Sequence, residues 1–128
     1  YSYSGISITS LEWIDALLEI KRRIESVSDY SFNSVLLNRY RNGSDGVSWH
    51  ADDEPELGQN PVIGSVSFGE SRPFQLKHKT LDARRKITLE NGSYLLMKGR
   101  TQHCWLHQIP KSKRILGERI NLTFRLIA

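Results

Sequence analysis

The stretch WHADDE, residues 49–54, places one histidine beside three carboxylates. Apolar and polar side chains alternate along residues 47–52, as they do in a half-buried β-strand. This alternation puts His50 and Asp52 on one face. These two side chains can therefore converge on one point, whereas Asp53 could join them only through a kink in the strand. A histidine and a carboxylate at this spacing can share a metal ion, although a lone His-X-Asp pattern is frequent by chance.

A metal site of this kind needs a further ligand from elsewhere in the chain. Two histidines and one carboxylate form the facial triad of non-haem Fe(II) oxygenases, which leaves metal positions open for other molecules, and zinc hydrolysis is less favoured. The candidates for the second histidine are His78, His103 and His107. A predicted strand at 103–108 puts His103 and His107 on a common face, so the spacing does not choose between them.

The predicted strand at 119–127 alternates strictly and has one apolar and one polar face. The apolar face holds Ile120, Leu122, Phe124 and Leu126, and the polar face holds Arg119, Asn121, Thr123 and Arg125. An edge strand with its polar face in water is the more common explanation. In a barrel, both faces are enclosed, and the arginines then need anionic partners. A small dicarboxylate would suit them, because arginine can grip a carboxylate with two parallel hydrogen bonds.

A second polar pair lies on a predicted strand at 33–40, where Asn38 and Tyr40 share a face. Their amide and hydroxyl groups could hydrogen-bond a bound acid. They could instead form an ordinary polar pair that is satisfied within the protein, which is the more frequent explanation of such a pattern.

The elements that position these residues follow from the hydrophobic periodicity. Residues 9–12 have the pattern of a capping box, and the apolar residues after them predict one amphipathic helix over about 10–27. Short alternating runs separated by turn residues then predict strands at 33–40, 47–52, 62–68, 73–79, 86–89, 93–97, 103–108 and 119–127. We therefore expect a mainly β fold, a double-stranded β-helix or jelly roll, with one N-terminal helix packed outside it.

The composition is that of one globular domain of 128 residues, 38% hydrophobic and 25% charged. The apolar runs are far shorter than the ~20 residues of a membrane span. The single cysteine, Cys104, excludes an internal disulfide and fits a reducing intracellular compartment. The net charge is +4, and basic residues gather in 72–86 and 98–114, which would attract a polyanion such as nucleic acid.

Four motifs together resemble the AlkB family of Fe(II)- and 2-oxoglutarate-dependent dioxygenases. They are Asn38-X-Tyr40, His50-X-Asp52, the histidine of Trp-X-His-X-X-Pro at 105–110, and Arg-X-Asn-Leu-Thr-Phe-Arg at 119–125. Order, spacing and residue type agree over nearly the whole chain. The run His-X-Asp-Asp-Glu-Pro is most similar to the vertebrate homologues that repair alkylated DNA and RNA.

The resemblance implies a role for each matching residue. Fe(II) would be bound by the catalytic residues His50, Asp52 and His107. The cosubstrate 2-oxoglutarate would be bound by Asn38, Tyr40, Ser65, Phe74, Arg119, Asn121 and Arg125. The substrate would be contacted by Glu54, Tyr1 and Tyr3.

The implied activity is oxidative demethylation of N-alkylated bases, of the 1-methyladenine and 3-methylcytosine type, in DNA or RNA. It uses Fe(II), O2 and 2-oxoglutarate and releases succinate, CO2 and formaldehyde. Because the methyl group sits on the Watson-Crick edge, the base must be single-stranded or flipped out. The basic segments at 72–86 and 98–114 would then contact phosphates.

Family members carry a substrate lid before the segment that matches residues 1–4. We expect residues 1–128 to be a single catalytic domain without this lid, in a truncated or partial sequence. We also expect a monomer with no membrane partner, located in the cytoplasm or nucleus.

Two other functions remain open. The first is a hydroxylase of proteins or small molecules, which Glu54 and the basic segments disfavour. The second is a catalytically silent nucleic-acid-binding module, which is disfavoured because every expected metal-ligand position is filled.

Overall fold

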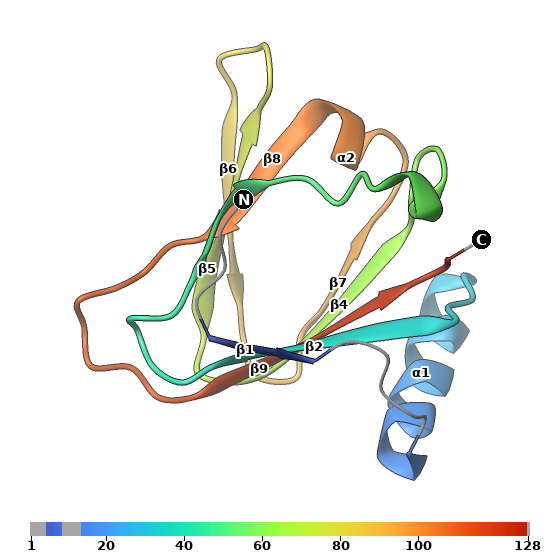
Figure 1. The fold of residues 1–128 in the computed structure, drawn as a ribbon, viewed down its shortest axis with the longest axis horizontal. Helices are drawn as coiled ribbons and strands as arrows, with labels where there is room; N and C mark the ends of the chain where they lie inside the picture. The colour runs from blue at the N-terminus through green and yellow to red at the C-terminus, as the bar shows by residue number, and fades with distance from the viewer. Residues whose placement is uncertain (1–4, 9–13, 128) are drawn as a thin grey trace.

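The computed structural model of the chain describes residues 5–8 and 14–127 (Figure 1). Along these residues the strands are β1 (Ile6–Ile8), β2 (Ser34–Tyr40), β3 (Val47–His50), β4 (Ile63–Gly69), β5 (Arg72–His78), β6 (Arg84–Leu89), β7 (Tyr94–Met97), β8 (Trp105–Ile109) and β9 (Arg119–Arg125). The helices are α1 (Asp15–Ser28), the short 3-10 helix η1 (Pro55–Leu57) and α2 (Thr101–Cys104).

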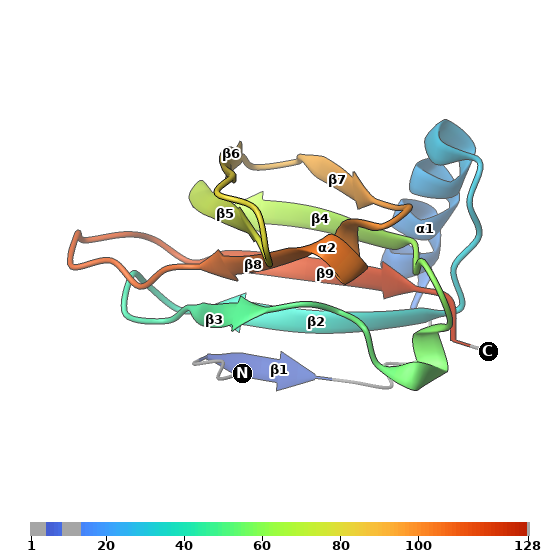
Figure 2. The ribbon, with the colours of Figure 1, turned by 90° about the horizontal axis from the view of Figure 1, so that it is seen from above.

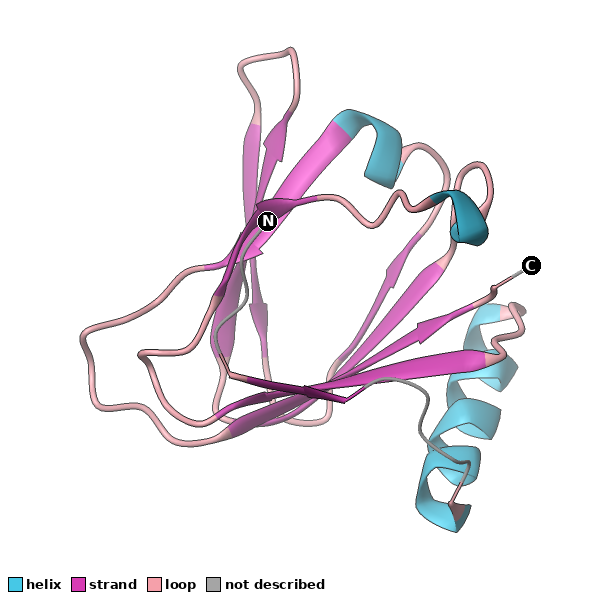
Figure 3. Ribbon diagram, viewed as in Figure 1, coloured by secondary structure: helices cyan, strands magenta, loops and turns pink. Residues whose placement is uncertain are grey.

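The strands form two antiparallel sheets that face each other. The larger sheet has the order β1-β2-β9-β4-β7, and the smaller has the order β3-β8-β5-β6. Figures 2 and 3 show the strands gathered in these two layers, with α1 outside them. The predicted mainly β fold with one external helix is therefore confirmed, while β1 adds a strand that the periodicity did not predict.

Helix α1 covers the outer face of the larger sheet. Its buried residues Leu17 and Ile24 pack in one cluster with Leu122 and Phe124 of β9. Ile14 is extended, so the helix begins at Asp15, later than the prediction of about 10–27. The predicted capping box at 9–12 lies outside the described residues.

Strand β9 lies at the centre of the larger sheet, between β2 and β4. Leu122 and Phe124 point toward α1, and the opposite face, which includes the buried Arg119 and Asn121, points between the sheets. The edge-strand explanation was therefore wrong, and β9 is enclosed on both faces. In its register, Tyr40 lies opposite Arg119.

Two predicted strand boundaries are corrected near the candidate metal ligands. β3 ends at His50, so Asp52 follows the strand instead of belonging to it. The segment before β8 is the helix α2, and His103 belongs to this helix. The predicted common face of His103 and His107 is therefore wrong, because a helical residue does not follow the alternation of a strand.

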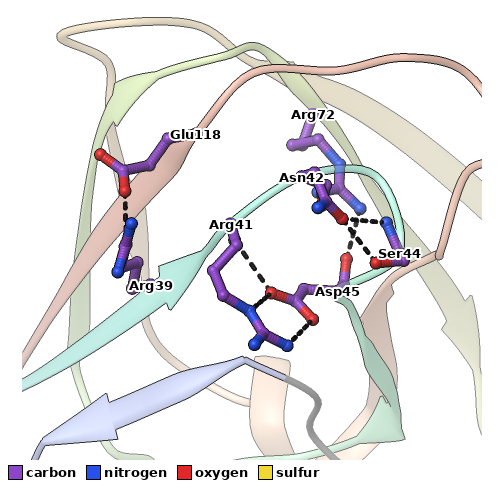
Figure 4. A network of polar contacts seen from close by, with 7 residues as sticks. All are labelled: Arg39, Arg41, Asn42, Ser44, Asp45, Arg72 and Glu118. Atoms are coloured by element: carbon purple, nitrogen blue, oxygen red, sulfur yellow. Dashed lines mark hydrogen bonds and ion pairs between the residues drawn. The ribbon is translucent and has the colours of Figure 1, made fainter.

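Figure 4 shows a polar network that ties the β2–β3 turn to Arg72 of β5. Arg72 is fully buried, and its Nη2 donates to the carbonyl oxygens of Asp45 (2.8 Å) and Pro110 (2.9 Å). The Asp45 carboxylate accepts hydrogen bonds from Arg41, which lower the pKa of Asp45 to about 2. The prediction of a phosphate contact at Arg72 is thus wrong, since its guanidinium is used inside the fold.

Candidate metal centre and cosubstrate pocket

A cavity of about 310 Å³ lies between the two sheets. Every predicted site residue within the described part of the chain lines it, namely Asn38, Tyr40, His50, Asp52, Glu54, Ser65, Phe74, His107, Arg119, Asn121 and Arg125. Tyr1 and Tyr3 lie outside the described residues. Residues that are far apart in the sequence are thus brought together because β2, β3, β4, β5, β8 and β9 all face one space.

His50, Asp52 and His107 form a cluster whose ligand atoms all lie within 4.8 Å of one another. His50 on β3 is the direct partner of His107 on β8 in the sheet register. Nε2 of His107 is 3.5 Å from Oδ2 of Asp52, and Nε2 of His50 is 4.0 Å from Oδ1. In the described part of the chain, neither His78 nor His103 joins a group of this kind. The cluster has the two-histidine, one-carboxylate donor set that suits non-haem Fe(II).

The protonation states of His50 and Asp52 favour metal binding. Nδ1 of His50 donates to the carbonyl oxygen of Ser48 at 2.7 Å, which leaves Nε2 with its lone pair toward the cluster. Burial, followed by the charge of His107, lowers the pKa of His50. Burial alone would raise the pKa of Asp52, but hydrogen bonding and charge from His107 outweigh it, and the pKa is lowered. A neutral imidazole and a carboxylate are the forms that bind a metal.

Gln102 contacts the cluster and was missed by the sequence reasoning. It is 1% exposed, and its Oε1 accepts a hydrogen bond from the backbone N–H of Asp52 at 2.8 Å. The same oxygen lies 3.3 Å from Nε2 of His107. No periodicity marked this residue, because it precedes the predicted strand at 103–108 and its partner lies 50 positions away.

The β9 side of the cavity is cationic. Arg119 is 2% exposed, its Nη2 donates to Oγ of Ser67 at 3.0 Å, and its guanidinium carbon lies 4.8 Å from the ring centroid of Tyr40. Asn121 donates to Oγ of Ser65 at 2.7 Å. Ser67 was also missed, although it follows Ser65 at strand spacing and alternation could have found it.

Two further polar atoms in the cavity wall are buried without a hydrogen-bond partner among the described residues. They are Nε of Arg125, a donor, and Oε2 of Glu54, an acceptor. Buried polar groups are normally satisfied, so a bound molecule is expected to supply their partners. The donor set, the guanidinium groups and these unsatisfied atoms fit an Fe(II) ion with a carboxylate cosubstrate.

Residues 1–125 match the family profile of the 2OG-Fe(II) oxygenase superfamily. The chain belongs to this superfamily. Fe(II) and 2-oxoglutarate are therefore its cofactors, and the cluster of His50, Asp52 and His107 is the candidate iron site.

Relatives of this chain carry AlkB names, which confirms the resemblance to the AlkB family. Alpha-ketoglutarate-dependent dioxygenase alkB homolog 3 of Bos taurus is 44% identical over 99% of this chain and 48% of the relative. The human protein of that name is 42% identical with the same coverage. DNA oxidative demethylase ALKBH2 of Mus musculus is 39% identical over 99% of this chain and 56% of the relative. The chain spans about half the length of the curated relatives it matches.

The fold of the chain is also that of a solved structure of OsALKBH1. The two superpose with a TM-score of 0.60 at 22% identity, over 88% of this chain and 60% of the other. This likeness confirms the jelly-roll fold. Within the described residues, no helix is long and apolar enough to cross a membrane.

Proposed function

We propose that residues 1–128 form one catalytic domain that removes N-methyl groups from bases in DNA or RNA. The observation that carries this proposal is the cavity in which the cluster of His50, Asp52 and His107 lies with two arginines and an unsatisfied glutamate. His50, Asp52 and His107 would hold Fe(II). Bound Fe(II), together with 2-oxoglutarate and O2, would supply the oxidation that releases the methyl group as formaldehyde, while 2-oxoglutarate is converted to succinate and CO2.

The β9 face of the cavity would bind 2-oxoglutarate. Arg119 would pair with its distal carboxylate, next to Tyr40, because the buried guanidinium and the phenol lie against each other. Asn38, Asn121 and Arg125 would hold the rest of the molecule, and Ser65 and Phe74 would line the pocket. Since Arg119 is almost fully buried, its attraction for an anion is screened little by salt.

Glu54 would read the base. Its buried Oε2 can accept a hydrogen bond from the exocyclic amino group of adenine or cytosine. Both bases carry this amino group next to the ring nitrogen that alkylation modifies. The base must leave its stack to enter the cavity, which costs a few kcal/mol and costs least for damaged or single-stranded bases.

Exposed basic residues would contact the phosphates. They lie on β6 and on the loop between β8 and β9 and include Arg84, Arg85, Lys86, Lys111, Lys113 and Arg114. The names of the ALKBH2 relatives, DNA oxidative demethylase, also support a nucleic-acid substrate. We propose that the protein acts in the cytoplasm or nucleus, where such a substrate is found, and that it acts as a monomer.

The test is incubation with Fe(II), 2-oxoglutarate and a panel of oligonucleotides, each carrying one methylated base, with mass spectrometry of the products. Loss of the methyl group from 1-methyladenine or 3-methylcytosine is expected, and it should require 2-oxoglutarate. Consumption of 2-oxoglutarate without methyl loss from any DNA or RNA would contradict the proposal and favour a protein or small-molecule substrate.

A further inference from the structure

Asp52, which supplies the carboxylate of the candidate metal site, is held through its backbone by a contact outside the β-sheet. The pairing between β3 and β8 ends at His50 and His107, so Asp52 lies two residues beyond the last paired position. Its backbone N–H donates instead to Oε1 of Gln102, at 2.8 Å. Strand β3 therefore positions His50, and the hydrogen bond from Gln102 positions the backbone of Asp52.

The orientation of the Gln102 amide is fixed from both sides. A backbone N–H can only donate, so the atom that faces Asp52 is the amide oxygen. The amide nitrogen points the other way and donates to Sδ of Met97 at 3.5 Å, within the buried interior. With 1% of its surface exposed, the side chain has almost no contact with water to compete for these positions.

The same amide oxygen of Gln102 lies close to both Asp52 and His107. It bonds the segment that carries Asp52 and lies 3.3 Å from Nε2 of His107. Gln102 itself belongs to α2, the single helical turn that runs directly into β8 and His107. A displacement of this side chain would therefore change the spacing between the Asp52 carboxylate and His107, now 3.5 Å.

We propose that Gln102 is a positioning residue of the metal site, which sets the Asp52 carboxylate against His107 before the ion binds. This inference rests on the proposed iron site and deepens it. Without the amide oxygen, the N–H of Asp52 is left without an acceptor, and the loop must shift to satisfy it. Groups that orient metal ligands typically change metal affinity by about 10- to 100-fold when they are removed.

The test replaces Gln102 with methionine, which keeps the length of the side chain and removes the oxygen. The matched control is Gln75→Met, which removes the hydrogen bond between Gln75 and Gln108 in the same sheet as His107, outside the cluster. Co(II) is titrated into each protein without O2 and is followed by its visible absorption, while thermal unfolding of the metal-free proteins reports stability.

We expect Gln102→Met to bind Co(II) about 10- to 100-fold more weakly, with altered absorption bands, and Gln75→Met to bind within about twofold of the unchanged protein. Equal binding by Gln102→Met and the unchanged protein would overturn the inference, and so would an equal loss in both variants. If Gln102→Met does not fold, Gln102→Asn carries the same test, because its amide is one methylene short of Asp52. Failure of the unchanged protein to bind Co(II) would overturn the proposed metal site itself.

Discussion

Replacing Arg119 with lysine tests how the cavity holds its cosubstrate. The variant keeps the positive charge at the start of β9 but loses the planar, five-donor guanidinium. In the structure this group donates through Nη2 to Ser67, lies against the ring of Tyr40 and lines the cavity. A lysine ammonium is a point charge that has neither the stack nor the paired donors.

The expected loss follows from the hydrogen bonds that disappear. A hydrogen bond to a charged group contributes about 1.5–3 kcal/mol, and lysine can replace only one of the two that a guanidinium gives to a carboxylate. The loss of one bond therefore corresponds to about 10- to 150-fold weaker binding of 2-oxoglutarate. Because Arg119 is 2% exposed, we expect this loss to persist at high salt.

The assay is a titration of 2-oxoglutarate into the Mn(II)-loaded protein without O2. Arg39→Lys is the matched control, since Arg39 lies beside Tyr40 on the same strand but is exposed and pairs with Glu118. Its affinity for 2-oxoglutarate should stay within about twofold of the unchanged protein, as expected for a surface pair. If Arg119→Lys also bound 2-oxoglutarate within twofold, while both variants bound Mn(II) normally, the assigned role of Arg119 would be refuted.

Three further predictions concern single carboxylates. Asp52→Ala should lose Fe(II) binding and with it all 2-oxoglutarate turnover, because two histidines hold the ion poorly; turnover at the unchanged rate would contradict the ligand assignment. Glu54→Ala should bind Fe(II) normally but alter the preference among methylated bases, and an unaltered preference across an oligonucleotide panel would count against base reading. Asp45→Asn should lower the free energy of unfolding by about 1–2 kcal/mol at neutral pH. Because the Asp45 pKa is lowered from 3.8 to about 2, this contribution is full above about pH 4 and is lost as the pH falls through 2, so denaturant unfolding of the two proteins should converge in strong acid.

Periodicity along the sequence predicted the helix, most of the strands and the shared faces of Asn38 with Tyr40 and of Arg119 with Asn121, because alternation directly reports which side chains lie on one side of a strand. Ser65, Phe74 and Glu54, which also line the cavity, were expected only from the resemblance to the AlkB family. The sequence could not say whether β9 lies at the edge or the centre of a sheet, since an alternating pattern fits both. The neighbours β2 and β4 decide this point, and they are far from β9 in the chain.

The metal site shows a second limit of the sequence. Asp52 was chosen for its alternation with His50, yet the strand ends at His50 and Gln102 holds Asp52 in place. Arg72 was predicted to contact phosphate, but it is buried against backbone carbonyls. Both contacts join residues that are distant in sequence, which no local pattern records.

The most direct test of the central claim is the stoichiometry of the reaction on one defined substrate. The protein would be incubated with Fe(II), 2-oxoglutarate and an oligonucleotide that carries one 1-methyladenine, with Asp52→Ala alongside. We expect formaldehyde, succinate and the unmethylated base to form in equal amounts and the variant to form none of them. Succinate formed without formaldehyde, or formaldehyde formed equally by Asp52→Ala, would contradict this claim.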